Sequence, residues 1–451
     1  MKHLVLDTNI ILLDHNNILT LGQDYIIVLP ETVIQELDAK KTLMNELGYQ
    51  ARAFGRLIAQ SPDIAIKHVI GNITEAILTV DNVTIKIASA STYPENTNND
   101  QKIISIALAY SAIHDTTFMS NDVACRIQAM AKGLKVSDLK EVEQTSYNFT
   151  KHLNVPSEFF PNLHNAAIEE VDPEYTLENH NYIFTDLTSG NTKLGIVHRG
   201  VIEIIGRTTE TDLRKQDVNP IGAEQLLLSR AIQRPDIDVI VCEARAGSGK
   251  TLVTLSNAIK LLKANNPYDS IVYIRASIDD VEKIEEMGFR SGNDEKVNPY
   301  FTPVEDSLEH IMRAKYPKKK GSQPDYEAMI QGKIVDAYEK YNIQLLTGLG
   351  LRGRTFTNAI VIIDEVQGQS KASLQKMLTR IGKDCKVIII GSQRQIDNQY
   401  VTKFNNGLSV LMNETTKAQP LIHLHAVNLS KVIRSPMAEW AEEVFSKDLL
   451  T

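Results

Sequence analysis

The stretch VCEARAGSGKTLVTL, Val241 to Leu255, decides the fold of this chain. It runs from an apolar segment into a glycine-containing loop and then into residues with helical spacing of leucine and isoleucine. Strand, glycine loop and helix, in that order, form a phosphate-binding loop, because backbone N–H groups close around the phosphate at the positive end of a helix. The sequence therefore predicts a nucleotide site on a parallel α/β sheet.

The residues of this loop match the phosphate-binding pattern at every position but one. Ala244 stands where the pattern has its first glycine. We expect Lys250 to reach the β- and γ-phosphates of ATP and the Thr251 hydroxyl to bind Mg²⁺. The residues expected to surround the phosphates are Gly247, Ser248, Gly249, Lys250 and Thr251. Ala244 is tolerable if its φ is negative and harmful if the site needs a positive φ. The alternative is a glycine-rich turn that binds nothing.

A second segment, AIVIIDEV from Ala359 to Val366, is an apolar run that ends in two carboxylates. As a buried strand, it would deliver Asp364 to hold Mg²⁺ and Glu365 to orient and deprotonate the attacking water. A strand can also end in acids only to meet solvent. A third apolar run, KVIIIGSQRQID, ends near Gln395, which is a candidate sensor of the γ-phosphate.

Length and composition indicate a globular protein of several domains. The 451 residues are too many for one hydrophobic core, and three scattered cysteines argue against a disulfide framework or a zinc cluster. No apolar run is long enough for a membrane span, so we expect a soluble cytoplasmic protein without membrane contact. The net charge is −8, so a nucleic acid would need a local basic surface, and the one basic run, Lys318 to Lys320, is most simply a solvated loop.

Three regions of the chain differ in their pattern. Residues 1–145 alternate short apolar strands with helical segments, which predicts an α/β domain with an inserted hairpin that turns at Asp81-Asn82. Residues 146–215 carry prolines and then alternate like antiparallel strands, which predicts a small β-rich connector. Residues 216–451 return to strands and helices and contain the nucleotide motifs. The predicted fold class is α/β, with parallel sheets in the two larger domains.

Four acidic residues of the first region lie where strands end or on the helices that follow them: Asp7, Glu36, Asp100 and Asp122. The carboxyl ends of parallel strands share one edge of a sheet, so these side chains can converge there. Converging carboxylates repel one another unless a cation neutralises them, and oxygen ligands favour Mg²⁺ or Mn²⁺, which can activate water for phosphodiester hydrolysis. Taken singly, each acid is at least as well explained as a helix cap or a solvated residue.

Several motifs resemble two known families. The first region resembles the PIN nuclease domain in LDTNIILLD, VLPETVIQELDAKK, GYQARAFGRLI and SNDVACRIQA. The last region resembles PhoH-type ATPases, relatives of superfamily 1 helicases, in RAGSGKTL, LRGRTF, VIIDEVQ, LTRIG, GSQRQID and VIRSPMAEWA, and also in the connecting segment MGFRSGNDEKVNPYFTPVEDSL. The whole chain therefore resembles the PIN-PhoH fusion family. This implies an N-terminal PIN-like domain and a C-terminal P-loop NTPase domain of the RecA-like type.

The resemblance implies an ATP-dependent RNA helicase coupled to a metal-dependent ribonuclease, which would unwind and cleave single-stranded or tailed duplex RNA. It implies a homo-oligomeric ring, such as a hexamer. By the same resemblance, the four acids of the first region are the nuclease metal ligands, with Asp100 the least certain because Asn98 and Asn99 adjoin it. ATP and Mg²⁺ would bind at the phosphate-binding loop, with Thr251 and Asp364 as metal ligands.

The resemblance also bears on four more residues of the last region. Gln225 is expected to recognise adenine, with an ordinary polar helix residue as the equal alternative. Arg434 and Arg380 are candidates for stabilising charge on the γ-phosphate, Arg380 from a neighbouring subunit, although each arginine could instead form a surface ion pair. Ser392 departs from the family, which usually has an aspartate there, and this puts the efficiency of hydrolysis in doubt.

Two rival functions stay open at this point. One is an ATP-binding regulatory or nucleic-acid-binding protein in which the acids of the first region are structural. The other keeps the nuclease and makes the ATPase degenerate through Ser392. The sequence also leaves open whether a small antitoxin-like partner restrains the protein.

Overall fold

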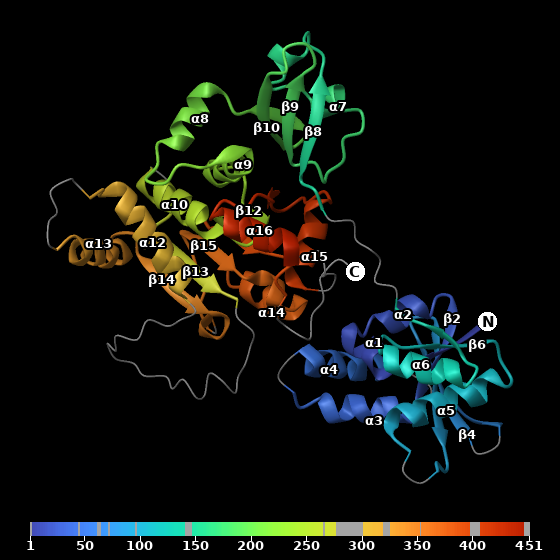
Figure 1. Ribbon diagram of the computed structural model, residues 1–451. Helices are drawn as coiled ribbons and strands as arrows, with labels where there is room; N and C mark the ends of the chain where they lie inside the picture. Colours follow the sequence, from blue (N-terminus) through green and yellow to red (C-terminus); the bar gives the residue numbers. More distant parts are fainter. Residues whose placement is uncertain are drawn as a thin grey trace. The chain divides into compact units, whose positions relative to one another are not determined.

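The chain folds into two compact units, Met1–Gln144 and Thr145–Thr451 (Figure 1). The computed structural model describes residues 2–43, 46–60, 65–70, 73–94, 97–139, 147–264, 267–276, 301–318, 325–351, 353–396 and 406–445. Most of the connecting segment MGFRSGNDEKVNPYFTPVEDSL and residues 319 and 320 of the basic run lie outside the described residues. Each unit is built around its own sheet.

The first unit contains a seven-stranded sheet with the order β3-β4-β5-β2-β1-β6-β7. Its strands are β1 (Lys2–Leu6), β2 (Tyr25–Pro30), β3 (Ala65–Ile70), β4 (Ile73–Val80), β5 (Val83–Ala90), β6 (Thr116–Met119) and β7 (Lys135–Ser137). Neighbouring strands in the row β5-β2-β1-β6-β7 are parallel. Strands β4 and β3 extend the sheet beyond β5 with antiparallel pairing. The predicted hairpin is confirmed, because Asp81 and Asn82 turn between β4 and β5 with φ of 47° and 65°.

The helices in the described part of the first unit are α1 (Thr8–Leu13), α2 (Asn17–Leu21), α3 (Glu31–Lys40), α4 (Glu46–Ile58), α5 (Asn99–Ser111) and α6 (Val123–Ala131). Three of them begin with a side chain that accepts from the first-turn N–H groups: Asp7 for α1, Asn98 for α5 and Asp122 for α6. The buried faces of strands and helices form one aliphatic core that includes Leu4, Ile27, Ile104 and Phe118. Strand ends and helix starts therefore place several polar residues along one edge of the sheet.

The second unit contains a six-stranded sheet in which every pairing is parallel, with the order β14-β13-β15-β16-β12-β17. Its strands are β12 (Val239–Ala244), β13 (Ser270–Arg275), β14 (Ile343–Thr347), β15 (Ala359–Asp364), β16 (Lys386–Gly391) and β17 (Leu424–Leu429). The three predicted buried strands are β12, β15 and β16. Their residues alternate between two cores, so that Ile240 and Ile362 face one side and Val241 and Ile363 face the other. The predicted α/β class with parallel sheets is confirmed.

Helices pack on this sheet and connect its strands (Figure 1). They are α8 (Arg207–Arg214), α9 (Gly222–Gln233), α10 (Lys250–Lys263), α12 (Thr302–Lys315), α13 (Tyr326–Lys340), α14 (Lys371–Leu378), α15 (Gly407–Thr415) and α16 (Pro436–Phe445). Short 3₁₀ turns at Gly348–Leu351 and Val366–Gly368 follow β14 and β15. Within the described parts of both units, no helix has the length and hydropathy needed to cross a membrane.

Residues 150–204 form a four-stranded sheet that belongs to the second unit and lies beside α9 (Figure 1). Its strands are β8 (Thr150–Val155), β9 (Asn181–Asp186), β10 (Thr192–His198) and β11 (Val201–Ile204), in the order β11-β10-β9-β8. The antiparallel pairing predicted here is found for β9, β10 and β11, whereas β8 pairs with β9 in parallel. A small core of its own includes Phe160, Tyr182 and Phe184, with the short helix α7 (Ile168–Val171) nearby.

Buried histidine and asparagine side chains join the four-stranded sheet to β17 and α15. His180 Nε2 lies 3.0 Å from the carbonyl oxygen of Thr415, and His425 Nε2 lies 2.9 Å from Asn181 Oδ1. Asn181 Nδ2 also donates to the carbonyl of Ala426 at 2.8 Å. Burial lowers the pKa of His180 to about 4 and that of His425 well below its ordinary value. Both histidines are therefore neutral in the folded protein at neutral pH.

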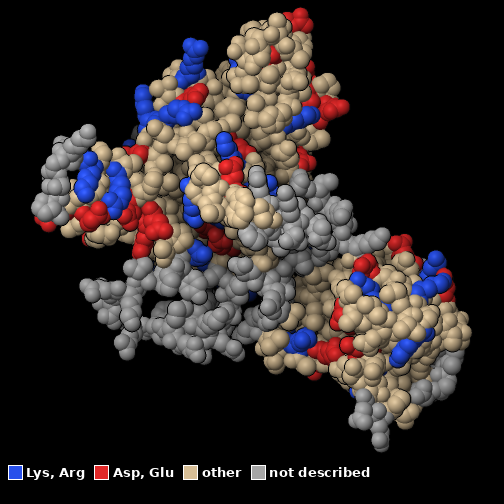
Figure 2. Space-filling model, in the orientation of Figure 1, with Lys and Arg blue, Asp and Glu red and all other residues tan. Residues whose placement is uncertain are grey.

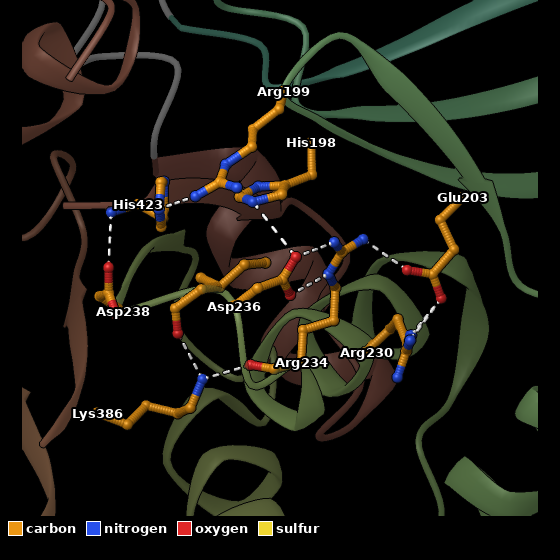
Figure 3. A network of polar contacts seen from close by, with 10 residues as sticks. His198, Arg199, Glu203, Arg230, Arg234, Asp236, Asp238, Lys386 and His423 are labelled. Atoms are coloured by element: carbon orange, nitrogen blue, oxygen red, sulfur yellow. Dashed lines mark hydrogen bonds and ion pairs between the residues drawn. The ribbon is translucent and has the colours of Figure 1, made fainter. Parts of the chain in front are cut away.

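A second polar network joins the four-stranded sheet to α9 and to the segment that leads into β12 (Figure 3). Glu203 on β11 accepts a hydrogen bond from Arg234, which also donates to Asp236 at 2.8 Å. Lys386, at the start of β16, donates to the carbonyl oxygens of Arg234 and Ile237 at 2.6 and 2.5 Å. Burial lowers the pKa of Lys386 to about 8. These contacts fix the end of α9 and the entry to the strand that precedes the phosphate-binding loop.

The neutral state of His180 predicts an acid-sensitive junction. The folded-state pKa of about 4 lies below the ordinary value of 6.5, so the unfolded chain binds a proton that the folded chain excludes. We expect His180 to remove about 3 kcal/mol from the free energy of unfolding as the pH falls from about 6.5 to 4. Urea unfolding of the wild type and His180→Gln across this range should show a shallower pH slope for the variant.

The exposed His152 on β8 provides the control for this measurement, because it lies on the same sheet and outside the junction. His152→Gln should keep the wild-type slope between pH 6.5 and 4. Equal slopes for His180→Gln and the wild type would show that protonation of His180 does not weaken the fold.

Candidate functional site

The loop between β12 and α10 has the backbone that phosphate binding requires. Gly247 and Gly249 adopt positive φ values of 73° and 78°. A Cβ atom added to Gly247 would also come within 3.0 Å of the Val432 side chain. Ala244 is the last residue of β12, so its backbone is extended and its φ is negative. The condition under which alanine is tolerable at the first loop position is therefore met.

The first N–H groups of α10 and the Ser248 hydroxyl can donate hydrogen bonds to an anion. Helix α10 begins at Lys250 with Gly249 as its N-cap and no side-chain cap, and the first N–H groups of a helix have no partner within it. Ser248 is 1% exposed, and its Oγ has no hydrogen-bond partner among the described residues. A buried hydroxyl without a partner is costly, and a phosphate oxygen would satisfy it. The loop thus fits the triphosphate of a nucleotide.

Two contacts join the loop to the end of β15. Thr251 Oγ1 donates to Asp364 Oδ2 at 3.0 Å, and Lys250 Nζ lies 3.2 Å from Glu365 Oε1. Burial alone would lower the pKa of Lys250, but Asp364 and Glu365 outweigh it and raise that pKa. Burial alone would raise the pKa of Glu365, but Lys250 holds it below its ordinary value. The structure therefore brings all four predicted residues together with Lys250 and Glu365 charged.

Glu365 occupies a sparsely populated backbone conformation, with φ 61° and ψ 40° at the start of the turn after β15. Gln367, which the sequence reasoning did not assign, donates to Glu365 Oε2 at 2.6 Å and to the carbonyl of Gln395 at 2.9 Å. Its Oε1 accepts from the N–H of Ser392 at 3.1 Å. Gln395 is thus connected to the site through its backbone. The signal for Gln367 was its place two residues after Glu365.

Ser392 is fully buried at the end of β16, and its Oγ has no hydrogen-bond partner in the described part of the chain. Its backbone N–H donates to Gln367 Oε1, and its carbonyl accepts from the N–H of Gln395 at 3.1 Å. A serine hydroxyl carries no negative charge, so it does not replace the charge of the aspartate that the family usually has at this position.

Gln225 lies on α9 and is 4% exposed. Its Oε1 accepts from the N–H of Ile221 at 2.7 Å, and its Nε2 donates to the carbonyl of Ser248 at 2.8 Å. The side chain therefore holds the phosphate-binding loop in place through its backbone. Recognition of adenine by Gln225 stays a prediction.

The predicted arginines differ in their position relative to the loop. Arg434 precedes α16, is exposed, and donates its backbone N–H to the carbonyl of Gly247 at 3.1 Å. Arg380 follows α14, and its carbonyl accepts from the N–H of Phe356 at 2.9 Å. No hydrogen bond or ion pair among the described residues joins Arg380 to the loop. Arg275, which was not predicted, ends β13 beside Asp364, and its charge helps to lower the pKa of Glu365.

Asp7 organises the acidic edge of the first unit. It is 6% exposed at the end of β1, where its carboxylate accepts from the N–H of Thr8 at 2.7 Å, from Asn9 Nδ2 at 2.7 Å and from Ser120 Oγ at 2.6 Å. Ser120 in turn accepts from the N–H of Asp122 at 3.0 Å. One serine therefore links two of the four predicted acids.

The other acids are linked in the same way. Glu36 on α3 accepts from the hydroxyl of Thr8 and from Asn99 Nδ2, the latter at 2.8 Å, and Asn99 adjoins Asp100 at the start of α5. Burial, and then the charges of Asp100 and Glu36, raise the pKa of Asp7. Burial, and then the charges of Asp122 and Glu36, raise that of Asp100. The neighbouring carboxylates therefore lie close enough to disfavour the ionised forms of Asp7 and Asp100.

The donor chemistry of this edge suits a hard cation, because the four acids, Asn9, Asn99 and Ser120 carry carboxylate, amide or hydroxyl oxygens. Among the described residues, however, no group of three or more His, Cys, Asp or Glu side chains is close enough to hold a metal ion. Thr8 and Asn99 instead donate to Glu36, and Asn9 and Ser120 donate to Asp7. The predicted ligands share one edge, and metal binding by them stays a prediction.

Comparison with known proteins matches both units to families. Residues 217–446 match the PhoH-like protein family, and residues 4–140 match the PIN domain. PIN domains and P-loop NTPases commonly use Mg²⁺ and ATP, which agrees with the donor chemistry of the acidic edge and of the loop.

Several relatives are similar along part or all of the chain. The protein PhoH2 of Bacillus subtilis is 26% identical over 466 aligned residues that cover 98% of this chain and 99% of the relative. PhoH2 of Mycolicibacterium smegmatis is 24% identical and covers 98% and 96%. A PhoH-like protein of Synechocystis is 31% identical over 219 residues, 48% of this chain and 59% of the relative. The chain belongs to the PhoH-like protein family and carries an N-terminal PIN domain, a combination that indicates a nuclease joined to an ATPase-like domain.

Proposed function

We propose that this protein is an ATP-dependent RNA helicase coupled to a metal-dependent ribonuclease. The observation that carries the proposal is the pair of contacts between Lys250 and Glu365 and between Thr251 and Asp364. They place a phosphate-binding cation, two candidate Mg²⁺ ligands and a candidate base at one edge of a parallel sheet. This is the arrangement that P-loop NTPases use for phosphoryl transfer to water.

In the proposed ATPase site, the loop N–H groups and the Ser248 hydroxyl bind phosphate, and Thr251 and Asp364 hold Mg²⁺, which neutralises charge on the β- and γ-phosphates. Lys250 leaves Glu365 and moves to the phosphates, because the anion is the stronger partner for its ammonium group. Glu365 is then free to accept a proton from the attacking water. Gln367 keeps the Glu365 carboxylate oriented through its 2.6 Å hydrogen bond.

In the proposed nuclease site, Asp7, Glu36, Asp100 and Asp122 would hold Mg²⁺ or Mn²⁺, and a bound ion would lower the pKa of a water for cleavage of the phosphodiester. The raised pKa values of Asp7 and Asp100 support this role, since negative charge gathered without a counter-ion favours cation binding. Asn9 and Ser120 would orient Asp7 as they do in the structure.

We propose single-stranded or tailed duplex RNA as the substrate and a homo-oligomeric ring as the assembly, in which Arg380 would serve a neighbouring subunit. On the face shown in Figure 2, basic and acidic side chains are interspersed over the described surface. Binding would therefore rest on local contacts to the RNA backbone and would weaken as salt is added. A weakened ATPase is the second candidate, favoured by the buried and unpartnered hydroxyl of Ser392.

Removal of the Lys250 ammonium group should abolish ATP turnover. We expect Lys250→Ala to lower kcat/KM for ATP by at least about 100-fold, because the charge that stabilises the transferred phosphoryl group is lost. The measurement is release of phosphate with Mg²⁺ present. Lys260→Ala, on the same helix but paired with Asp212, should hydrolyse ATP like the wild type. Equal activity of Lys250→Ala and the wild type would refute the assigned loop.

Neutralisation of Asp7 should abolish RNA cleavage. We expect Asp7→Asn to cut labelled single-stranded RNA more than about 100-fold more slowly, since the central acid of the metal site loses its charge. Asp115→Asn is the matched control, because Asp115 is exposed in the same unit and pairs with Lys135 away from the acidic edge. Cleavage by Asp7→Asn at the wild-type rate would remove the nuclease assignment.

The two sites should fail independently. With tailed duplex RNA, Lys250→Ala should lose unwinding but still cleave single strands when Mg²⁺ or Mn²⁺ is present. Asp7→Asn should unwind with ATP and leave the strands intact. Separation of strands by Lys250→Ala at the wild-type rate would show that the loop does not drive the helicase.

A further inference from the structure

We propose that Tyr273 is a positioning residue of the nucleotide-dependent Mg²⁺ site and acts through Asp364. The inference deepens the proposed ATPase function and rests on it. It assigns to a side chain of β13 the task of orienting the carboxylate at the end of β15.

The contact between Tyr273 and Asp364 is buried and short. Tyr273 is fully buried, and its hydroxyl donates to Asp364 Oδ2 at 2.6 Å. The same oxygen accepts from Thr251 Oγ1 at 3.0 Å, and Asp364 Oδ1 accepts from the N–H of Glu365 at 2.9 Å. Three donors therefore hold both oxygens of one carboxylate, and two of them meet at the oxygen that links Asp364 to the loop.

The register of the sheet explains why a tyrosine reaches this point. Tyr273 lies beside Ile362 in the parallel pairing of β13 and β15, so it stands two residues before the row of Asp364. Side chains of a strand alternate between faces, and Tyr273, Ile362 and Asp364 therefore project to the same face. The ring of a tyrosine at this position is long enough to bring its hydroxyl to the edge of the sheet. The hydroxyl of a shorter side chain would lie inside the core and would not reach Asp364.

In the described part of the chain, the Tyr273 ring contacts Phe301 and its hydroxyl contacts Asp364. The ring packs edge-on against Phe301, with 6.4 Å between ring centroids, within the aliphatic core. A buried tyrosine needs a partner for its hydroxyl, and the partner that the described contacts give Tyr273 is Asp364. Phenylalanine would fill the same core without the hydroxyl, so packing alone does not require tyrosine.

Loss of the hydrogen bond between Tyr273 and Asp364 should change Mg²⁺ binding and should not change phosphate binding. Thr251 and Asp364 are the residues that would hold Mg²⁺, and groups that orient a metal ligand change metal affinity or activity about 10- to 100-fold when removed. Phosphate binding by the loop amides, Ser248 and Lys250 involves no contact with Tyr273. Loss of the hydroxyl should therefore weaken the response to Mg²⁺ and spare ATP binding without metal.

Tyr273→Phe tests the inference in the full-length protein. Calorimetric titration of ATP at a series of Mg²⁺ concentrations, and in EDTA, gives the metal-free Kd and the Mg²⁺ concentration for half-maximal tightening. We expect that concentration to rise about 10-fold with the metal-free Kd unchanged. Tyr182→Phe is the matched control, because it removes a buried hydroxyl that donates to Asp172 at 2.7 Å in the four-stranded sheet. This control should match the wild type.

The outcomes separate the inference from the function it rests on. An unchanged Mg²⁺ requirement in Tyr273→Phe, while the wild type tightens with Mg²⁺, overturns the role of Tyr273 and leaves the ATPase proposal standing. A wild type that binds no ATP overturns both. A change in the metal-free Kd alone would show that Tyr273 only supports the fold. If Tyr273→Phe melts below the working temperature, Tyr273→Met also lacks the hydroxyl and should show the same shift.

Discussion

The second unit depends on the hydrogen bond between Thr251 and Asp364, which spans two strands of the parallel sheet that are not neighbours. Strand β16 lies between β12 and β15, so the loop after one and the carboxylate at the end of the other meet only because all three strands end at the same edge. Beside this contact, Lys250 faces Glu365 at 3.2 Å, and its ammonium group also interacts with the charge of the buried Asp364. Removal of either partner of such a pair leaves an uncompensated charge, so Lys250 and Glu365 tie the start of α10 to the end of β15.

The strands, the loop and the acids could be predicted because their signals are local. Five apolar residues before Asp364 predict a buried strand, and glycine, lysine and threonine at fixed spacing predict the loop. Tyr273 carries no such signal, because its role arises from a contact with Asp364, which lies about 90 residues away. For Gln367 the local signal was its place two residues after Glu365, whereas its contact with Ser392 joins segments about 25 residues apart. Gln225 shows the same limit, since its position suggested adenine and its contacts are with the backbone of Ile221 and Ser248.

The acidic edge of the first unit shows what local patterns leave out. The positions of Asp7, Glu36, Asp100 and Asp122 were predictable from strand ends, but their separation depends on the neutral residues between them. Thr8, Asn99 and Ser120 donate to carboxylates or bridge them, and this disperses charge that would otherwise have to be protonated or neutralised. A cation would compete with these donors, so their strength sets part of the cost of metal binding.

The four-stranded sheet is physically connected to the phosphate-binding loop, although its sequence suggested only a connector. Glu203 on β11 binds Arg234 at the end of α9, and Lys386 fixes the carbonyl of Arg234 from β16. The same helix carries Gln225, which holds the carbonyl of Ser248 in the loop. The sheet also joins β17 through Asn181 and His425, and the carbonyl of Leu429 at the end of β17 accepts from the N–H of Arg245 in the loop at 3.0 Å. Both α9 and β17 therefore connect the four-stranded sheet to the loop. The sheet is therefore placed where it can act on the nucleotide site without touching the nucleotide.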